Sequence, residues 1–267
     1  MQTLWSSVFS VVKILSKSLT TETQRSHGEP LSYFFRQTLW GEQPYARLRT
    51  YFSGVMKPNL KPVTLTNDGL ATAAQILASR DRRLASIYRA HGTPPMWARR
   101  PGFQTLLRIV LEQQVSLVSA RSMFERLSSN IDPFTPTRFI EFGEQNLRLL
   151  GVTRQKAHYC VQVAHAFTNG HLKTIARLPD EEAHAALLRI KGVGPWTANI
   201  YLLMALRRPD IWPDGDIALA SAVGMLRKMK TRPSFAELAR IAERWRPYRS
   251  VAARMLWQFY LAERGRL

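Results

Sequence analysis

The stretch LLRIKGVGPWTAN, residues 187–199, is the most informative part of the sequence. It consists of an apolar helix end, a Gly-x-Gly turn at residues 192–194, and a new helix opened by Pro195. Glycine adopts positive φ and lets another group approach the backbone closely, and proline suits the first helical position because its missing N–H would be unpaired there. The stretch therefore predicts a tight hairpin of two helices.

The backbone of such a hairpin is a candidate anion site. Free N–H groups of the turn and of the following helix start, together with the helix dipole, bind a phosphate without reading base sequence. We expect these contacts from Gly192, Val193, Gly194 and Thr197. An ordinary connection between two helices has the same Gly-x-Gly pattern, so neighbouring features must decide between the two interpretations.

The body of the protein is predicted to be all-α. From about Asp68 onward, apolar residues recur at helical spacing, and the alternation typical of strands is nearly absent. Ser234 and Glu237 form a plausible capping box, which would open a helix running through Trp245. A second long helix is expected from about residue 248 to residue 263.

Residues 1–60 differ from this body and are interpreted as an N-terminal extension. Serine, threonine and scattered aromatic residues dominate it, and it ends in the proline-containing stretch MKPNLKP, residues 56–62. Its first 19 residues are amphipathic, basic and free of acidic side chains. A disordered tail, a targeting segment and a misassigned upstream start codon all remain open as explanations.

Composition favours a polyanionic partner. The chain has 38 Lys and Arg residues against 19 Asp and Glu residues, a formal charge of +19. Nucleic acid is the first candidate, while a membrane surface or a general basic bias are the alternatives. No apolar run approaches the roughly 20 residues needed to cross a bilayer, so we expect a soluble protein without a membrane partner. A single cysteine, Cys160, excludes an internal disulfide framework and a four-cysteine iron–sulfur cluster.

A second motif, WPDGDIAL at residues 212–219, places two carboxylates, Asp214 and Asp216, directly before the start of another predicted helix. A hairpin, a connecting helix and an aspartate after a proline-bearing loop resemble the helix-hairpin-helix-GPD superfamily of base-excision DNA glycosylases. The tryptophan of the hairpin makes the 3-methyladenine DNA glycosylase II type most similar. Residues 101–116, and residues 242–250 together with Trp257, also resemble that type. The resemblance covers residues 68–264, which we interpret as the glycosylase domain.

This resemblance implies an all-α fold in which two helical subdomains flank a DNA-binding cleft. It also implies a base-excision repair enzyme that flips alkylated bases, of the 3-methyladenine and 7-methylguanine class, out of double-stranded DNA and hydrolyses the N-glycosidic bond. Asp216 would be the catalytic carboxylate. Asp214 is the rival, and a helix cap is the structural alternative for Asp216.

The resemblance also suggests the residues around the base. Trp196, Trp257, Ile200 and Ile217 would line the base pocket, since an electron-rich indole attracts a cationic purine by roughly 0.5–2 kcal/mol. Core packing is the alternative for both tryptophans. A wedge residue would fill the gap left in the duplex, and Gln114 is our first choice, with Gln113 as the alternative. Arg154 and Lys156 are either phosphate contacts or ordinary surface charges.

Several departures from the wider superfamily limit the chemistry. Members that also cut the strand have a lysine where this chain has Trp196, because an amine forms the Schiff base with the sugar. Lys191 is a poor substitute, so we expect no lyase activity. We also expect no catalytic metal and no iron–sulfur cluster, with a monovalent cation at the hairpin as the one candidate ion.

Two other functions remain open: a glycosylase for oxidised or mismatched bases, and a non-catalytic helix-hairpin-helix DNA-binding protein. Asp216 and the two tryptophans favour the alkylation enzyme over a mere binder. We expect a monomer, located in the cytoplasm with the nucleoid in a bacterium, or in the nucleus or an organelle in a eukaryote.

Overall fold

The computed structural model describes residues 62–265, and every regular element in that part of the chain is helical, which confirms the all-α prediction. The predicted N-terminal extension, residues 1–60, lies outside the described residues. The helices are α4 (Asn67–Arg80), α5 (Arg82–His91), α6 (Phe103–Glu112), α7 (Leu117–Asn130), α8 (Pro136–Leu149), α9 (Arg154–Thr168), η2 (Ile175–Arg177), α10 (Asp180–Leu188), α11 (Pro195–Met204), α12 (Ile217–Leu226), α13 (Phe235–Ala242), η3 (Glu243–Trp245) and α14 (Arg249–Ala262). Between residues 62 and 265 no helix combines the length and apolarity needed to cross a bilayer.

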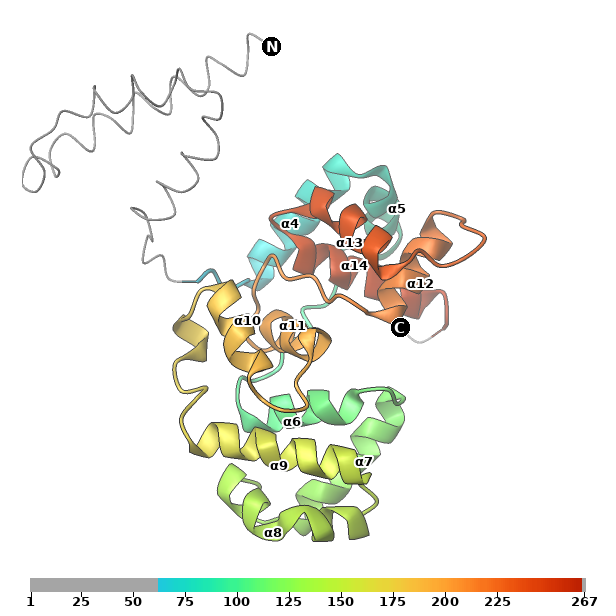
Figure 1. Cartoon of the computed structure of the whole chain (residues 1–267). Helices are drawn as coiled ribbons and strands as arrows, with labels where there is room; N and C mark the ends of the chain where they lie inside the picture. Colours follow the sequence, from blue (N-terminus) through green and yellow to red (C-terminus); the bar gives the residue numbers. More distant parts are fainter. Residues whose placement is uncertain (1–61, 266–267) are drawn as a thin grey trace, which may run out of the picture. The chain divides into compact units, whose positions relative to one another are not determined.

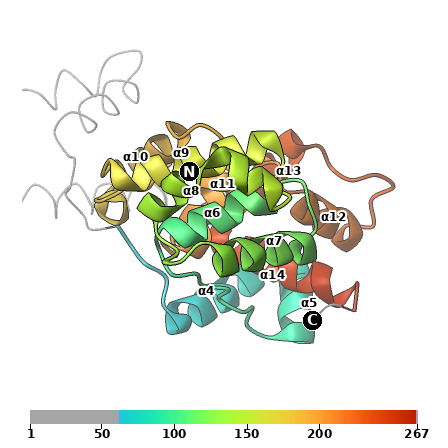
Figure 2. The ribbon, with the colours of Figure 1, turned by 90° about the horizontal axis from the view of Figure 1, so that it is seen from below.

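The helices form two groups joined by a hairpin (Figure 1). Helices α4, α5, α12, α13 and α14 pack against one another, and helices α6 to α9 form the second group. Figure 2 shows the second group, green to yellow, from below. The α10–α11 pair lies between the groups in Figure 1, and α11 packs on α6. The hairpin therefore couples residues that lie far apart in the sequence.

Side-chain caps explain where many of the helices begin. At these starts a Thr, Asp or Ser oxygen accepts a hydrogen bond from a free N–H of the first turn, which contributes about 1 kcal/mol per cap. The capping residues are Thr66, Asp81, Ser116, Thr135, Thr153, Asp216 and Ser234.

The predicted C-terminal helices form, with small differences at their ends. The capping box of Ser234 and Glu237 is present. Helix α13 ends at Ala242, earlier than predicted, because the chain tightens into the 3₁₀ turn η3 before Pro247. Pro247 cannot continue a helix, so α14 begins only at Arg249.

A buried arginine ties the last helix to the rest of the molecule. Arg254 of α14 is completely buried and donates to the carbonyl oxygens of Met96 at 2.8 Å, Ser250 at 3.0 Å and Leu203 at 2.8 Å. Burial lowers the pKa of its guanidinium to about 10. Because three carbonyl groups stabilise the buried charge, Arg254 locks together α14, the end of α11 and the segment before α6.

Asp81 makes a comparable junction in the first group. It caps α5 through the backbone N–H groups of Arg83 and Leu84, and it accepts a hydrogen bond from Trp245 Nε1 at 3.1 Å. Burial acts to raise the pKa of Asp81, but these three hydrogen bonds outweigh it and hold the pKa below its ordinary value. The carboxylate form is therefore the one that the fold stabilises.

Replacing Asp81 by alanine should destabilise the protein by about 1–3 kcal/mol, because a helix cap is lost and a buried indole N–H loses its acceptor. Urea unfolding at neutral pH measures this difference. Since the pKa of Asp81 is lowered in the folded state, its contribution is present above the unfolded pKa and is lost as the pH falls through the folded pKa. The difference between parent and variant should therefore shrink as the pH is lowered below the pKa of an unfolded aspartate, about 3.9. Asp68→Ala, an exposed site on α4, should cost less than about 0.5 kcal/mol.

Candidate active site

Asp216 stands at the start of α12, where it caps the helix. Its Oδ1 accepts a hydrogen bond from the Leu219 backbone N–H at 2.9 Å, and the residue is only 8% exposed. The preceding loop turns at Gly215, whose φ of 80° is left-handed. The helix-cap interpretation of Asp216 is therefore correct. The other contacts of this carboxylate show whether it has a second role besides capping.

Both predicted tryptophans donate to this carboxylate. Trp196 Nε1 of α11 lies 3.0 Å from Asp216 Oδ2, and Trp257 Nε1 of α14 lies 3.3 Å from Asp216 Oδ1. With the cap, three N–H donors from three helices surround one acidic group. Asp214, the rival carboxylate, is solvent-exposed. The structure thus brings Asp216, Trp196 and Trp257 together and leaves Asp214 outside the cluster.

The two indoles differ in how much of their surface is free. Trp257 is 9% exposed and Trp196 is half-buried. Because each indole N–H is occupied by Asp216, each indole presents its N–H edge to the carboxylate rather than a ring face. Orientation of the carboxylate is a role for both residues that the sequence did not suggest.

Trp97 is a third indole at this site, and the sequence analysis overlooked it. Its ring meets the ring of Trp257 in an edge-to-face arrangement with centroids 6.5 Å apart. Its φ of 44° is a left-handed conformation that is strained for a bulky side chain. A tryptophan in the non-helical stretch after Pro94 and Pro95 was the available signal, since it has no helix face on which to be buried.

The segment that carries Trp97 is anchored on both sides. The Met96 carbonyl accepts from Arg254, and the Arg99 N–H donates to the Met204 carbonyl at 3.0 Å. The Arg99 guanidinium also pairs with Glu112 through two hydrogen bonds of 2.9 and 3.0 Å. These contacts hold the strained residue beside Trp257, and such strain persists only where the surrounding structure imposes it.

A buried serine holds the loop before Asp216 against α14. Ser250 Oγ accepts from the Ile211 N–H at 2.9 Å and donates to the Ile211 carbonyl at 3.1 Å. The Ser250 N–H in turn donates to the Pro209 carbonyl. Trp257 lies two helical turns further along α14, so one helix positions both the Asp216 loop and one of its indole donors.

The predicted hairpin is present, and its two glycines serve different purposes. Gly192 has a φ of 91°, and a Cβ placed there would overlap the ring of Tyr159. Gly194 has an ordinary φ of −89°, and a Cβ built on it would meet no described atom within 4 Å. Gly192 is therefore required by the fold, whereas the space beside Gly194 is open to something outside the chain.

Two of the predicted anion-binding residues point inward. Val193 is buried, and its N–H donates to the Ile190 carbonyl at 3.0 Å. Thr197 is 1% exposed, and its hydroxyl accepts a hydrogen bond from Gln113. What Thr197 can offer a phosphate is its backbone N–H, one of the first-turn groups that lack an intrahelical partner. The turn carbonyls are oxygen donors suited to a hard cation, and the monovalent cation there stays a prediction.

The two wedge candidates have separate surroundings. Gln113 Nε2 donates to the Gly192 carbonyl and to Thr197 Oγ1, both at 2.9 Å, so this side chain links α6 to the hairpin. Gln114 is exposed and has a strained φ of 57°. Lys156 Nζ donates to the carbonyls of Leu111 and Gln113 at 2.7 and 2.8 Å, and burial lowers its pKa. The structure thus leaves Gln114 free and commits Gln113 and Lys156 to holding its turn.

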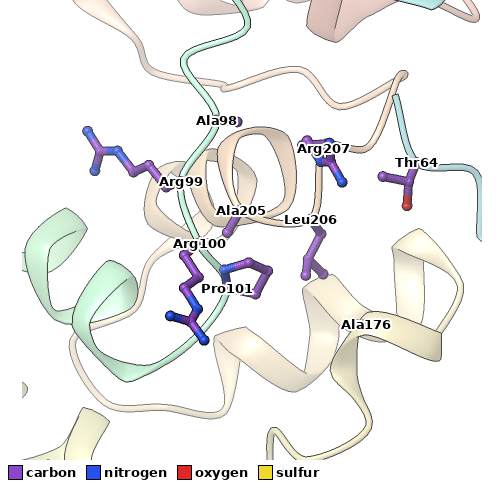
Figure 3. Close-up of a pocket in the computed structure, with 9 residues that line it drawn as sticks. All are labelled: Thr64, Ala98, Arg99, Arg100, Pro101, Ala176, Ala205, Leu206 and Arg207. Carbon is purple, nitrogen blue, oxygen red and sulfur yellow. The ribbon is translucent and has the colours of Figure 1, made fainter. Parts of the chain in front are cut away.

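The remaining predicted residues differ in their burial. Ile200 is 2% exposed and belongs to the hydrophobic core, while Ile217 is 59% exposed at the first position of α12. Arg154 is exposed at the start of α9. A separate cavity of about 380 Å³ lies between the segment from Ala98 to Pro101 and the end of α11 (Figure 3). No predicted site residue lines this cavity.

Comparison with known proteins identifies the family of this chain. Residues 107–247 match the family model described as HhH-GPD superfamily base excision DNA repair protein. The Bacillus subtilis protein YfjP is 26% identical over 66% of this chain and 64% of its own length. A DNA-3-methyladenine glycosylase of the same organism is 29% identical over 58% of this chain and 56% of its own length. The chain therefore spans less than two thirds of these relatives.

A solved structure has the same fold. The 3-methyladenine DNA glycosylase Mag1 of Schizosaccharomyces pombe, in complex with abasic DNA, superposes with a TM-score of 0.66 at 23% sequence identity. The match covers 72% of this chain and 97% of the Mag1 chain. Because the family model alone spans more than half of the sequence, the chain belongs to the HhH-GPD superfamily of base excision DNA repair proteins.

Proposed function

We propose that the protein is a monofunctional DNA glycosylase that flips alkylated bases out of double-stranded DNA and hydrolyses their N-glycosidic bonds, acting as a monomer. The observation that carries the proposal is the buried Asp216 carboxylate, held by the indole N–H groups of Trp196 and Trp257. Family membership and the 3-methyladenine glycosylases among the relatives support the same chemistry.

In this proposal Asp216 acts on charge that develops in the sugar. Breaking the glycosidic bond makes the sugar cation-like, and a fixed carboxylate in a partly dry site stabilises that state or orients the attacking water. A flexible carboxylate would first have to be oriented. The three N–H donors remove that cost, because they set both carboxylate oxygens before the substrate arrives.

The alkylated base itself would be recognised by ring faces. Purines methylated at N3 or N7 carry positive charge, and an indole face attracts such a cation. Trp257 has little exposed surface, so we assign the contact with the base to Trp196 and Trp97 and assign mainly orientation of Asp216 to Trp257. Ile200 is buried and Ile217 points to solvent, which makes them weaker candidates for the pocket.

The duplex would be held by the hairpin and opened by the neighbouring turn. A phosphate would sit beside Gly194, against the free N–H groups at the start of α11. Gln114 would enter the stack, since its side chain is exposed and its turn is tied to the hairpin through Gln113. Exposed Val115, Leu117 and Val118 follow it and offer apolar contact with the opened base step.

The same residues support the absence of lyase activity. Trp196 occupies the position that the superfamily resemblance assigns to the Schiff-base lysine. Lys156 is engaged by two carbonyl groups, and Lys191 is exposed on the hairpin. Neither lysine is therefore placed to attack the sugar beside Asp216.

Asp216→Asn should slow base release from methylated duplex DNA by a hundredfold or more, since losing one such electrostatic group costs on the order of 3–4 kcal/mol. Single-turnover release of 3-methyladenine measures the effect. Asp214→Asn, which changes an exposed carboxylate outside the cluster, should release bases at nearly the parental rate. The parent should nick the strand only after alkali treatment. Undiminished release by Asp216→Asn would remove this residue from the mechanism, and nicking without alkali would refute the monofunctional assignment.

The two hairpin glycines provide a paired test of the phosphate grip. Gly194→Ala should leave thermal stability nearly unchanged, because its φ is ordinary and its surroundings are open, but should weaken duplex binding by blocking the phosphate. Gly192→Ala should lower stability by about 1–3 kcal/mol through strain and overlap with Tyr159. Thermal melts and fluorescence anisotropy separate the two effects. Full DNA affinity in Gly194→Ala would contradict the proposed contact.

Trp97→Ala should reduce kcat/KM for cationic bases more than for a neutral damaged purine such as hypoxanthine, by roughly 2- to 30-fold, the range of a cation–π contact. Trp97→Phe should recover part of the loss. Trp245→Phe, a buried indole that binds Asp81, is the control and should lower stability without changing the ratio between the two substrates. An unchanged ratio in Trp97→Ala would place Trp97 outside the pocket.

A further inference from the structure

Six cations gather at the far end of α12 from Asp216. Four of them lie in the stretch RKMKTR, residues 227–232, which connects α12 to α13 and extends beyond the helices in Figure 1. Arg83 of α5 and Arg244 of η3 lie close enough to Arg227 to repel its charge. We call this surface the basic ridge; its members are Arg83, Arg227, Lys228, Lys230, Arg232 and Arg244.

The charge of the basic ridge is not compensated within the described residues, where none of its members forms an ion pair with a carboxylate. The acidic groups nearby have other partners. Glu237 is bound by Ser234, Glu243 pairs with Arg246 and Arg249, and Asp81 accepts from Trp245 and caps α5. Burial, then repulsion from Arg83 and Arg244, lowers the pKa of Arg227, although Asp81 opposes this. Such a cluster attracts a polyanion, because the fields of neighbouring like charges add.

The connection is a folded structure and not a loose tether. The Met229 N–H donates back to the Gly224 carbonyl at 2.9 Å, and the Lys228 N–H donates to the Met225 carbonyl at 3.0 Å. A Cβ placed on Gly224 would lie 3.6 Å from the Arg232 Cα and 3.7 Å from Pro233, so the returning chain packs closely over α12. Lys228, Lys230 and Arg232 all remain exposed. Their side chains therefore project from a fixed backbone.

The position of the basic ridge relative to Asp216 indicates what covers it. Helix α12 has ten residues between the carboxylate and Arg227, a distance of about 15 Å at 1.5 Å per residue. Successive base pairs are about 3.4 Å apart along the duplex, so 15 Å corresponds to four or five of them. A duplex whose extruded nucleotide meets Asp216 can thus present backbone phosphates to the far end of the same helix.

We propose that the basic ridge binds the phosphate backbone of the duplex within about five base pairs of the flipped nucleotide, on one side of the lesion only. The inference rests on the proposed function, because DNA is taken to be the substrate. In this arrangement the hairpin binds one segment of the DNA backbone, and the basic ridge binds a second segment. The two grips would fix the direction in which the damaged strand enters the site.

The test combines the triple variant Lys228→Ala/Lys230→Ala/Arg232→Ala with duplexes of different arm length. Each duplex carries a tetrahydrofuran abasic-site analogue, with both arms about one helical turn long or with one arm cut to about three base pairs. The parent should lose affinity when one particular arm is shortened and not when the other is. The triple variant should bind more weakly than the parent and should be indifferent to that same shortening. Its salt slope should be shallower by about 0.9 for each phosphate that the variant no longer neutralises.

The control variant Arg148→Ala/Lys173→Ala/Arg177→Ala removes the same number of exposed cations elsewhere. It should keep the dependence on arm length. The proposal would be overturned if both variants lost the same amount of duplex affinity. It would also be overturned if the affinity of the triple variant still fell when the arm was shortened. Unchanged DNA binding together with abolished binding to phosphatidylserine vesicles would likewise overturn it and would assign the basic ridge to a membrane. Failure of the parent to release any base would refute the glycosylase assignment. The binding comparison does not require base release, so it tests the basic ridge separately.

Discussion

One buried carboxylate sets the requirements for the rest of the structure. Asp216 is largely removed from water, and a charge in that position is tolerated only when hydrogen bonds replace its hydration. The donors come from its own helix α12, from Trp196 on α11 and from Trp257 on α14. Each of these helices must therefore be placed to within hydrogen-bonding tolerance of a common point. The packing around the site holds α11, α12 and α14 in these positions.

Several buried polar contacts serve this placement. Arg254 joins α14 to the end of α11, and Ser250 joins α14 to the loop that carries Asp216. Gln113 connects the hairpin to the turn at Gln114, and Lys156 of α9 binds the same turn through the carbonyls of Leu111 and Gln113. Strain accompanies these contacts, since Trp97 and Gln114 both adopt left-handed conformations. Residues of this kind concentrate where a fold is shaped for function, because the surrounding packing imposes conformations that the chain alone would avoid.

The large positive charge divides into two roles once the structure is considered. Arg254 and Arg208 are buried and bind backbone carbonyls, so they support the fold. Lys156 likewise binds carbonyl groups, although its position at the start of a helix after Gly151 made it a candidate for phosphate contact. The second role is contact with a partner. Within residues 62–265, exposed cations such as Lys228, Lys230 and Arg232 of the basic ridge form no ion pair and are available for it. Net charge identifies the class of partner, whereas burial identifies which cations are free to meet it.

The resemblance to a known family placed Asp216, Trp196 and Trp257 in one site, whereas the residue pattern alone predicted the helical class, the hairpin with its two glycines, and the capping box at Ser234. These features are readable because periodicity, capping and turn formation are local and depend on residues a few positions apart. Long-range packing determines that the indoles present their N–H edges to the carboxylate and that Trp97 joins them. It also determines that Gln113 turns inward while Gln114 stays exposed. The same packing places Ile200 in the core and Ile217 in solvent. Those outcomes depend on contacts between residues far apart in the sequence, such as Met96 and Arg254, which are about 160 positions apart. The local sequence does not show which of two neighbouring side chains, such as Gln113 and Gln114, forms a contact of this kind.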